Sequence, residues 1–229
     1  MITVRPSEAR GPADHGWLQS RHSFSFGSYY DPAHMGVSAL RVINDDKVAA
    51  GAGFAPHSHQ DMEIISYVKK GMIEHKDSMG NIEQLPPGEF QLMSAGTGVT
   101  HSEYNPSNTD SLEFLQIWIQ PDVHGIEPGY QQKAFEPQTG LQLIASPDAR
   151  DGSLRLHQDA SLYRLWLAAG EQTDFEQTVE RTAYLHVVSG SVRVNGELLG
   201  EGDGATLSQV DQVEFEAEAE TEALFFDLP

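Results

Sequence analysis

Two short stretches of the chain carry metal-binding side chains at a spacing of two residues. His57 and His59 lie in "GAGFAPHSHQDME", and His101 and Glu103 lie in "GTGVTHSEYN", directly after a glycine-rich turn. In an extended chain, residues i and i+2 point to the same side, and adjacent strands lie about 4.8 Å apart. Two inward pairs on neighbouring strands can therefore direct four side chains at one ion. Imidazole and carboxylate ligands suit Fe, Ni, Cu, Mn or Zn, so we expect a metal site.

The residues alone leave the carboxylate ligand open. Glu63 has the same parity as the first histidine pair, and Glu103 has the same parity as His101, so either glutamate can complete the set. Donors held on strands can leave coordination positions free for water, oxygen or a substrate, and a free position distinguishes catalytic from structural metal sites. The competing interpretation is that these side chains are unrelated surface or core residues.

The second half of the chain has no matching set of ligands. The positions that correspond to the first histidine pair fall in "EQTVER", and those that correspond to the second pair fall in "QVEFE". The remaining histidines of this half, His157 and His186, are isolated, and we do not expect them to bind metal.

Short alternating segments bounded by Gly, Pro, Asn and Asp recur along the chain, whereas helical periodicity is scarce. This pattern is typical of an all-β protein. A strand, a glycine turn and a second strand occur around Gly71 and again around Gly190, and each copy is followed by a Gly-acid turn. We therefore predict two β-barrels in tandem. The segment 120–140, rich in Pro, Gly and Gln, separates them, and we place the domains at residues 1–132 and 133–229.

The last regular segment, "VEFEAEAETEALFF", reads as one continuous strand. Glutamates alternate with Phe, Ala and Thr over residues 214–223, which places an acidic row on one face. Such a row is typical of a solvated face that protects a strand edge from aggregation.

Aromatic residues near the N-terminus form a second alternating pattern. His22, Phe24 and Phe26 of "HSFSF" share one face of an expected strand. They either line the mouth of a pocket for a planar ligand or belong to an N-terminal strand that simply covers the barrel.

Composition excludes several classes of protein and site. The formal net charge of −20 disfavours direct binding to nucleic acid or to anionic membranes, and the absence of cysteine excludes disulfides and thiolate metal sites. The N-terminus shows no signal peptide, and no apolar run approaches the ~20 residues of a transmembrane helix. We expect a cytoplasmic protein without membrane contact.

The spacing of these motifs resembles that of the cupin superfamily. A glycine at 51, the two histidines, Glu63 and Gly71 match the first cupin motif, and Gly98, His101 and Asn105 match the second. Within the cupins the chain resembles the pirin family nearly end to end, in "GWLQSRHSFSFGSYYDP", "HQDMEIISYV", "LMSAGTGVTHSE" and "LIASPDARDGS". The proline expected before the second glycine turn is missing, with Ala95 in that neighbourhood, and the gap before Gly71 is one residue longer. Both departures affect turns rather than ligands.

The resemblance implies a bicupin, with two jelly-roll barrels and one metal in the first. The implied ligands are His57, His59, His101 and Glu103, and the metal is usually Fe(II), with Cu, Ni, Mn and Zn as alternatives. Glu63 would then support a ligand histidine and fix its tautomer, or be a solvated strand residue.

Some pirins open the flavonol quercetin with O2, and animal pirin is also a redox-responsive nuclear cofactor. The resemblance thus predicts a dioxygenase on a flavonol-like substrate, releasing carbon monoxide and a depside, with Glu103 as the group that accepts the substrate hydroxyl proton. Two alternatives remain open. One is a metal- or redox-sensing protein with an unidentified protein partner and incidental quercetinase activity, and the other is a cupin isomerase on a small metabolite.

Overall fold

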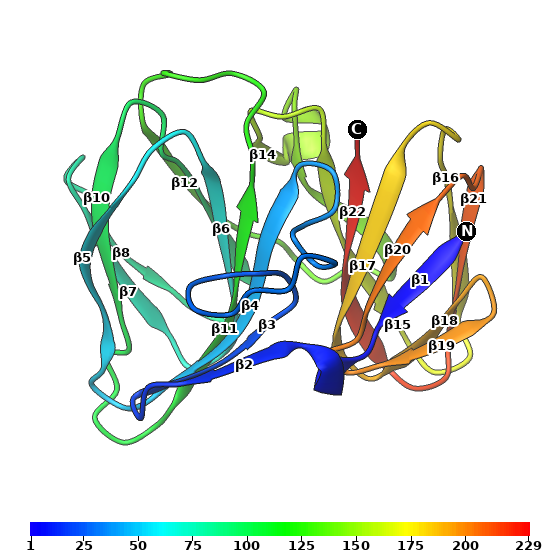
Figure 1. Cartoon of the computed structure of the whole chain (residues 1–229), viewed down its shortest axis with the longest axis horizontal. Helices are drawn as coiled ribbons and strands as arrows, with labels where there is room; N and C mark the ends of the chain where they lie inside the picture. The colour runs from blue at the N-terminus through cyan, green and yellow to red at the C-terminus, as the bar shows by residue number, and fades with distance from the viewer.

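The computed structural model describes residues 1–229, and nearly all of its regular structure is β-strand (Figure 1). The helical elements are two three-residue turns, η1 (Ser7–Ala9) and η2 (Arg150–Gly152). Neither has the length or apolar character needed to span a bilayer. The all-β prediction is confirmed.

The first half consists of two antiparallel sheets that face each other across an interior space. A seven-stranded sheet has the order β12-β9-β6-β11-β4-β3-β2, and a four-stranded sheet has the order β5-β10-β7-β8. The strands are β2 (Gly11–Asp14), β3 (Leu18–His22), β4 (Leu40–Val48), β5 (Gly53–His59), β6 (Glu63–Lys70), β7 (Ile73–Asp77), β8 (Ile82–Leu85), β9 (Glu89–Ser94), β10 (Val99–Tyr104), β11 (Leu112–Ile119) and β12 (Gly129–Ala134).

The second half repeats this arrangement. Its seven-stranded sheet has the order β1-β20-β17-β22-β15-β13-β14, and its four-stranded sheet has the order β16-β21-β18-β19. The strands are β1 (Ile2–Arg5), β13 (Gly140–Ser146), β14 (Leu154–Arg155), β15 (Ser161–Leu167), β16 (Gln172–Glu176), β17 (Thr182–Ser189), β18 (Ser191–Val194), β19 (Glu197–Gly200), β20 (Gly204–Ser208), β21 (Gln212–Ala217) and β22 (Thr221–Leu228).

The predicted barrels are not confirmed as closed barrels. In each half the strands form two separate hydrogen-bonded sheets, and no ladder joins them around the circumference. Each half is therefore described as a pair of facing sheets.

Two strands complicate a simple division of the chain. The N-terminal strand β1 pairs with β20 of the second half along its whole length, as the blue arrow among the orange and yellow strands of Figure 1 shows. The predicted boundary near residue 132 falls inside β12, which pairs with β9 of the first half. The division at that residue stays a prediction.

The single long strand predicted near the C-terminus is wrong. β21 ends at Ala217 and β22 begins at Thr221, because the chain passes there from the four-stranded to the seven-stranded sheet. The Thr221 hydroxyl donates to the Ser191 carbonyl at 2.8 Å and accepts from the Ser191 amide at 3.0 Å, which fixes the corner. Glutamates still alternate with Ala and Thr across the corner, so the sequence pattern does not reveal it, although Ala219 is exposed between the buried Ala217 and Thr221.

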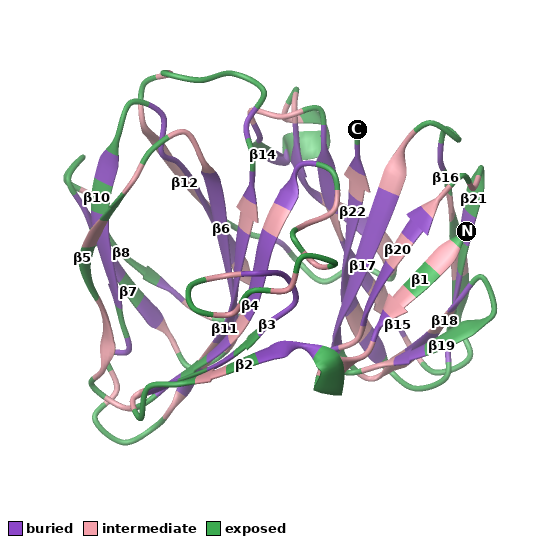
Figure 2. Cartoon of the chain, in the orientation of Figure 1, coloured by how far each residue is buried: buried purple, intermediate pink, exposed green.

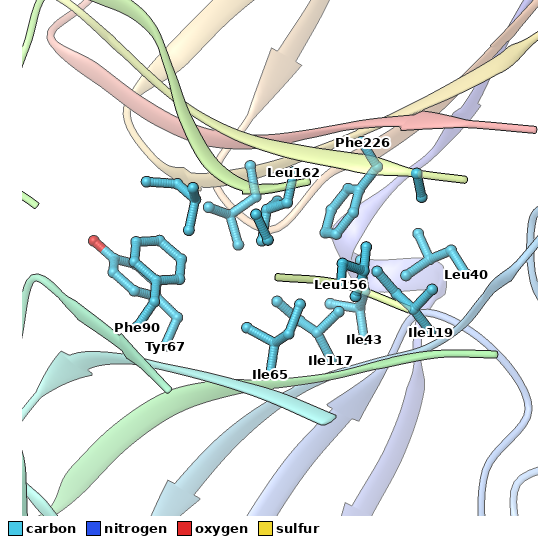
Figure 3. Packing of buried hydrophobic residues seen from close by; sticks show 14 of the residues in the cluster. Leu40, Ile43, Ile65, Tyr67, Phe90, Ile117, Ile119, Leu156, Leu162 and Phe226 are labelled. Carbon is cyan, nitrogen blue, oxygen red and sulfur yellow. The ribbon is translucent and has the colours of Figure 1, made fainter. Parts of the chain in front are cut away.

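The largest apolar cluster lies between the two seven-stranded sheets and joins the two halves. Ile65 and Ile117 of the first half face Leu162 and Phe226 of the second, and all four are fully buried (Figure 3). Buried residues accordingly concentrate along the strands at the centre of the molecule (Figure 2). Because one face of the first seven-stranded sheet packs here, its other face is free to line the interior of the first half.

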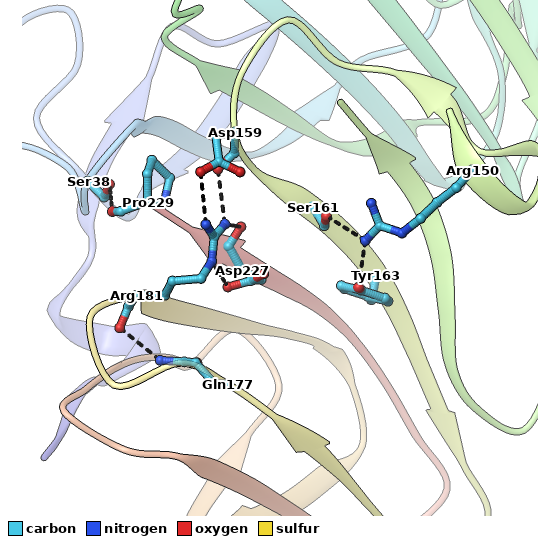
Figure 4. A network of polar contacts seen from close by, with 9 residues as sticks. All are labelled: Ser38, Arg150, Asp159, Ser161, Tyr163, Gln177, Arg181, Asp227 and Pro229. Atoms are coloured by element: carbon cyan, nitrogen blue, oxygen red, sulfur yellow. Dashed lines mark hydrogen bonds and ion pairs between the residues drawn. The ribbon is translucent and has the colours of Figure 1, made fainter. Parts of the chain in front are cut away.

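Polar contacts at the edge of this interface fix the ends of the second sheet (Figure 4). The Arg181 guanidinium lies 2.6 Å from Asp227 and 3.0 Å from Asp159, so it ties the start of β17 to the end of β22 and to the loop before β15. Ser38 donates a hydrogen bond to the carbonyl of Pro229, which ties the first half to the C-terminus.

Candidate metal centre

The two predicted motifs lie on adjacent strands. β5 and β10 are antiparallel neighbours, and His57 is paired directly with His101. The register shifts between His101 and Glu103, which is the mark of a β-bulge, and bulges redirect side chains next to functional sites. Gly98 precedes this strand with φ of +141°, a conformation that favours glycine. The glycine-rich turn therefore delivers the chain into β10 in the register that the histidines need.

Three of the four predicted residues converge. Ring nitrogens of His57, His59 and His101 lie within 4.8 Å of one another. Both ring nitrogens of His101 and the Nε2 of His59 are buried and have no hydrogen-bond partner. The His57 Nδ1 lies 2.8 Å from the Ala55 carbonyl, so as the donor of that bond it leaves Nε2 free. Unpartnered nitrogens aimed at one point fit a divalent metal ion.

The electrostatics of the cluster favour neutral imidazoles. Burial, with a smaller contribution from the neighbouring histidines, lowers the pKa of His101 to about 3 and that of His59 to about 4. A metal ion binds the neutral form of imidazole. Near pH 7 the nitrogen lone pairs of both residues are therefore available without loss of a proton.

Glu103, two residues after His101 on β10, is already hydrogen-bonded. Its carboxylate accepts a hydrogen bond from Ser66 Oγ at 3.2 Å and another from Gln116 Nε2 at 2.9 Å. The side chain is buried, and burial raises the pKa of its carboxyl group. Its oxygen lies within 4.8 Å of ring nitrogens of His101 and His75, in a second group of three, so its role as fourth metal ligand stays a prediction.

His75 is a buried residue of this region that the sequence interpretation missed. It lies on β7, opposite Glu103 in the ladder between β7 and β10. Its Nε2 is 3.1 Å from the Asp77 carboxylate, and its Nδ1 is 3.3 Å from Gln91 Nε2. His75 and Asp77 alternate in "IEHKD", which is the spacing that identified the other histidines and could have found this one.

The predicted support of a metal-binding histidine by Glu63 is wrong. Glu63 accepts hydrogen bonds from Ser94 Oγ at 3.0 Å and from the amide of His157 at 3.2 Å, and the ring of His157 lies 3.4 Å away. Asp61, with φ of +46°, turns the chain between β5 and β6, so the parity of the first motif does not carry across. The side chain therefore points away from the cavity, on the face that carries Ile65.

The alternative for Glu63, a solvated strand residue, is also wrong, because its side chain is 1% exposed. His157 binds Glu63 instead of standing alone. His186 is buried on β17, where burial lowers its pKa to about 3, and neither His157 nor His186 belongs to a group of metal-ligand side chains.

A cavity of about 580 Å³ is lined by three of the four predicted ligands, His57, His59 and Glu103. Its volume is typical of a small-molecule site. Four aromatic side chains line it, and His59 packs edge-on against one of them, with ring centroids 5.0 Å apart. These aromatic residues are Trp17, Phe26, Phe54 and Trp118.

The aromatic pattern of "HSFSF" is only partly realised. His22 and Phe26 line the cavity, but Phe24 lies in the apolar cluster between the halves, 5.4 Å from the ring of Tyr184. β3 ends at His22, so the strand alternation stops before the two phenylalanines. The predicted shared face of all three residues is wrong for that reason.

Comparisons with known proteins agree with this geometry. The pirin family model matches residues 3–119, and the model of the quercetinase C-terminal cupin domain matches residues 143–228. A quercetin 2,3-dioxygenase of Escherichia coli is 53% identical over 100% of this chain and 99% of its own length. A putative quercetin 2,3-dioxygenase of Pasteurella multocida is 46% identical over 100% of both chains.

Two crystal structures of the Escherichia coli protein YhhW superpose closely on this chain. One is 53% identical with a TM-score of 0.99 and covers 100% of this chain and 98% of its own. The other, a bacterial pirin in complex with nickel(II), is 52% identical with a TM-score of 0.98 and covers 100% and 99%. Sequence, fold and the histidine cluster agree, and the chain belongs to the pirin family of cupin proteins.

Proposed function

We propose that this protein is a metal-dependent dioxygenase that opens the heterocycle of quercetin or a similar flavonol with O2. The observation that carries the proposal is the cluster of three imidazoles with unpartnered nitrogens, two of which, His57 and His59, line an aromatic cavity. Relatives that align along the whole chain bear the name quercetin 2,3-dioxygenase, and a close structural relative binds nickel(II).

We assign the metal ligands to His57, His59, His101 and Glu103, and the metal to Fe(II). When bound there, a redox-active ion would exchange electrons with oxygen and the flavonol, which zinc cannot do. For Glu103 to reach the ion, its carboxylate must exchange one of its two present hydrogen bonds for a metal bond. The hydrogen bond that is kept, from Ser66 or from Gln116, then holds the other oxygen and orients the carboxylate.

The remaining residues of the cavity bind and orient the substrate. Trp118, Phe26 and Phe54 present apolar ring surfaces that suit a planar flavonol and exclude water. Glu103 is the carboxylate that we propose to receive the proton of the substrate hydroxyl. In the overall reaction both atoms of O2 enter the products, the heterocycle opens, and carbon monoxide leaves together with the depside, so no external reductant is consumed.

The proposal is tested by metal reconstitution under anaerobic conditions. The protein is loaded separately with Fe(II), Cu(II), Ni(II), Mn(II) or Zn(II), and oxygen uptake is followed after addition of quercetin. We expect uptake with a redox-active metal and none with zinc. His101→Ala should abolish uptake, whereas His124→Ala should not, because His124 is exposed outside the cavity.

Other outcomes separate the alternative functions. Metal binding without oxygen uptake under any loading would refute the dioxygenase and favour a metal- or redox-sensing protein with a separate partner. Turnover of a small metabolite without oxygen, and with zinc in place of iron, would favour a cupin isomerase.

A further inference from the structure

One carboxylate in the cavity has no role in the account above. Asp46 lies on β4 of the seven-stranded sheet, whereas His57 and His59 lie on β5 of the other sheet, yet all three line the same cavity. The side chain of Asp46 is 4% exposed. Its Oδ1 is buried and has no hydrogen-bond partner.

The neighbouring carboxylates are all partnered. Asp45, the adjacent residue, lies 2.5 Å from the Lys69 ammonium and 3.4 Å from the Arg10 guanidinium. Glu103 accepts two side-chain hydrogen bonds. More than nine in ten buried polar groups in native structures have a partner, and an exception calls for an explanation. The open acceptor at Asp46 is thus an exception among the carboxylates of this site.

The surroundings of Asp46 compensate its charge only in part. Burial is the main cause that raises the pKa of its carboxyl group to about 7; a hydrogen bond from Ser20 opposes it, and the nearby charges of Asp45 and Glu103 add to it. A buried carboxylate oxygen without a partner costs stability. A carboxylate that destabilises the fold but lies in the wall of a cavity is typical of a binding site. A bound ligand would donate the missing hydrogen bond.

The rest of the cavity indicates what that ligand is. Its aromatic walls suit a flat ring system, and its acceptors at Asp46 and Glu103 suit hydroxyl donors rather than anions. Resting on the proposed function, we infer that Asp46 accepts a hydrogen bond from a substrate hydroxyl group. It thereby selects polyhydroxylated planar aromatic compounds over the same ring system without hydroxyl groups.

The inference is tested by ligand binding to the zinc-loaded protein, in which no oxygen chemistry occurs. Dissociation constants of quercetin and of flavone, the unhydroxylated ring system, are measured by quenching of tryptophan fluorescence. In Asp46→Leu, which removes the acceptor, quercetin should bind about 10- to 100-fold more weakly, as for loss of a hydrogen bond to a charged group. Flavone binding should change less than about threefold, within the scatter of such contacts.

Two further variants control the measurement. Asp46→Asn keeps a neutral acceptor and should lose less affinity for quercetin than the leucine variant. Asp122→Asn changes an exposed aspartate outside the cavity and should bind both compounds as the wild type does. Zinc content and thermal unfolding are measured for each variant. If Asp46→Leu does not fold, Asp46→Asn is compared with the wild type in its place.

The results separate this inference from the proposed function. If quercetin binds equally well to the wild type and to both Asp46 variants, the inference is overturned, whatever the oxygen assay shows. If quercetin binding depends on Asp46 but the wild type takes up no oxygen with any metal, the recognition holds and the dioxygenase fails.

Discussion

Replacing Asp46 with asparagine should make the protein more stable near pH 7, even though it weakens ligand binding. The buried carboxylate has an unpartnered oxygen, and burial raises its pKa from 3.8 to about 7. At about 1.4 kcal/mol per pKa unit, the cost of ionising this group in the folded protein is at most about 4 kcal/mol. Local relaxation reduces such costs, so we expect Asp46→Asn to gain about 2 kcal/mol in free energy of unfolding at pH 7.

The sign of the pH dependence follows from the raised pKa. A carboxyl group whose pKa is higher in the folded state makes its full contribution to stability below the unfolded value of 3.8, and this contribution is lost as the pH rises through about 7. The advantage of Asp46→Asn over the wild type should therefore shrink from about 2 kcal/mol at pH 7 to about 1 kcal/mol at pH 5.

The assay is urea unfolding of the metal-free wild type and variant at both pH values. The difference between the two proteins isolates this group, because the other titrating residues are common to both. A variant that is less stable than the wild type, or whose advantage is the same at pH 5 and pH 7, would show that Asp46 is satisfied within the fold. The reasoning about its open acceptor would then be wrong.

Three other changes test the account elsewhere. Burial lowers the pKa of His186 to about 3, so between pH 6.5 and pH 5 the unfolded chain takes up a proton that the folded protein does not. The free energy of unfolding should therefore fall by about 2 kcal/mol over this range. Urea unfolding of His186→Gln should lack this loss, and an unchanged pH dependence would contradict it. In Gly53→Ala the new Cβ meets the backbone carbonyl of Glu103, so β5 must shift away from β10. Zinc affinity, measured by calorimetry, should fall about 10-fold or more. Unchanged affinity would contradict a rigidly held site. Ile117→Ala opens a cavity between the two large sheets and should cost about 2–5 kcal/mol in thermal unfolding, with zinc affinity unchanged.

The metal cluster could be predicted because its determinants are local. His57 and His59 are two residues apart on one strand, and strand geometry alone places them on one side. The pairing of His57 with His101 joins two strands that are far apart in sequence, and periodicity cannot predict such a pairing. The resemblance to the two cupin motifs predicts it.

The errors arose where the chain changes sheets. Strand alternation does not hold from His59 to Glu63, because the chain turns at Asp61 between them. Glu63 belongs to the other sheet, and its side chain faces away from the cavity. The corner between β21 and β22 is also a change of sheet, and it escapes sequence reading because the residue types keep alternating through it, although Ala219 is exposed in the structure. Asp46 could not be identified from sequence, because its missing partner is a property of the whole cavity wall.

The stoichiometry of the reaction distinguishes a flavonol dioxygenase from every alternative. The Fe(II)-loaded protein is mixed with quercetin and oxygen, and oxygen consumed, flavonol lost and carbon monoxide released are measured in the same reaction. A dioxygenase gives equal amounts of all three, and no reaction with zinc or in His101→Ala. Loss of quercetin without carbon monoxide, or equal rates with zinc and iron, would contradict it.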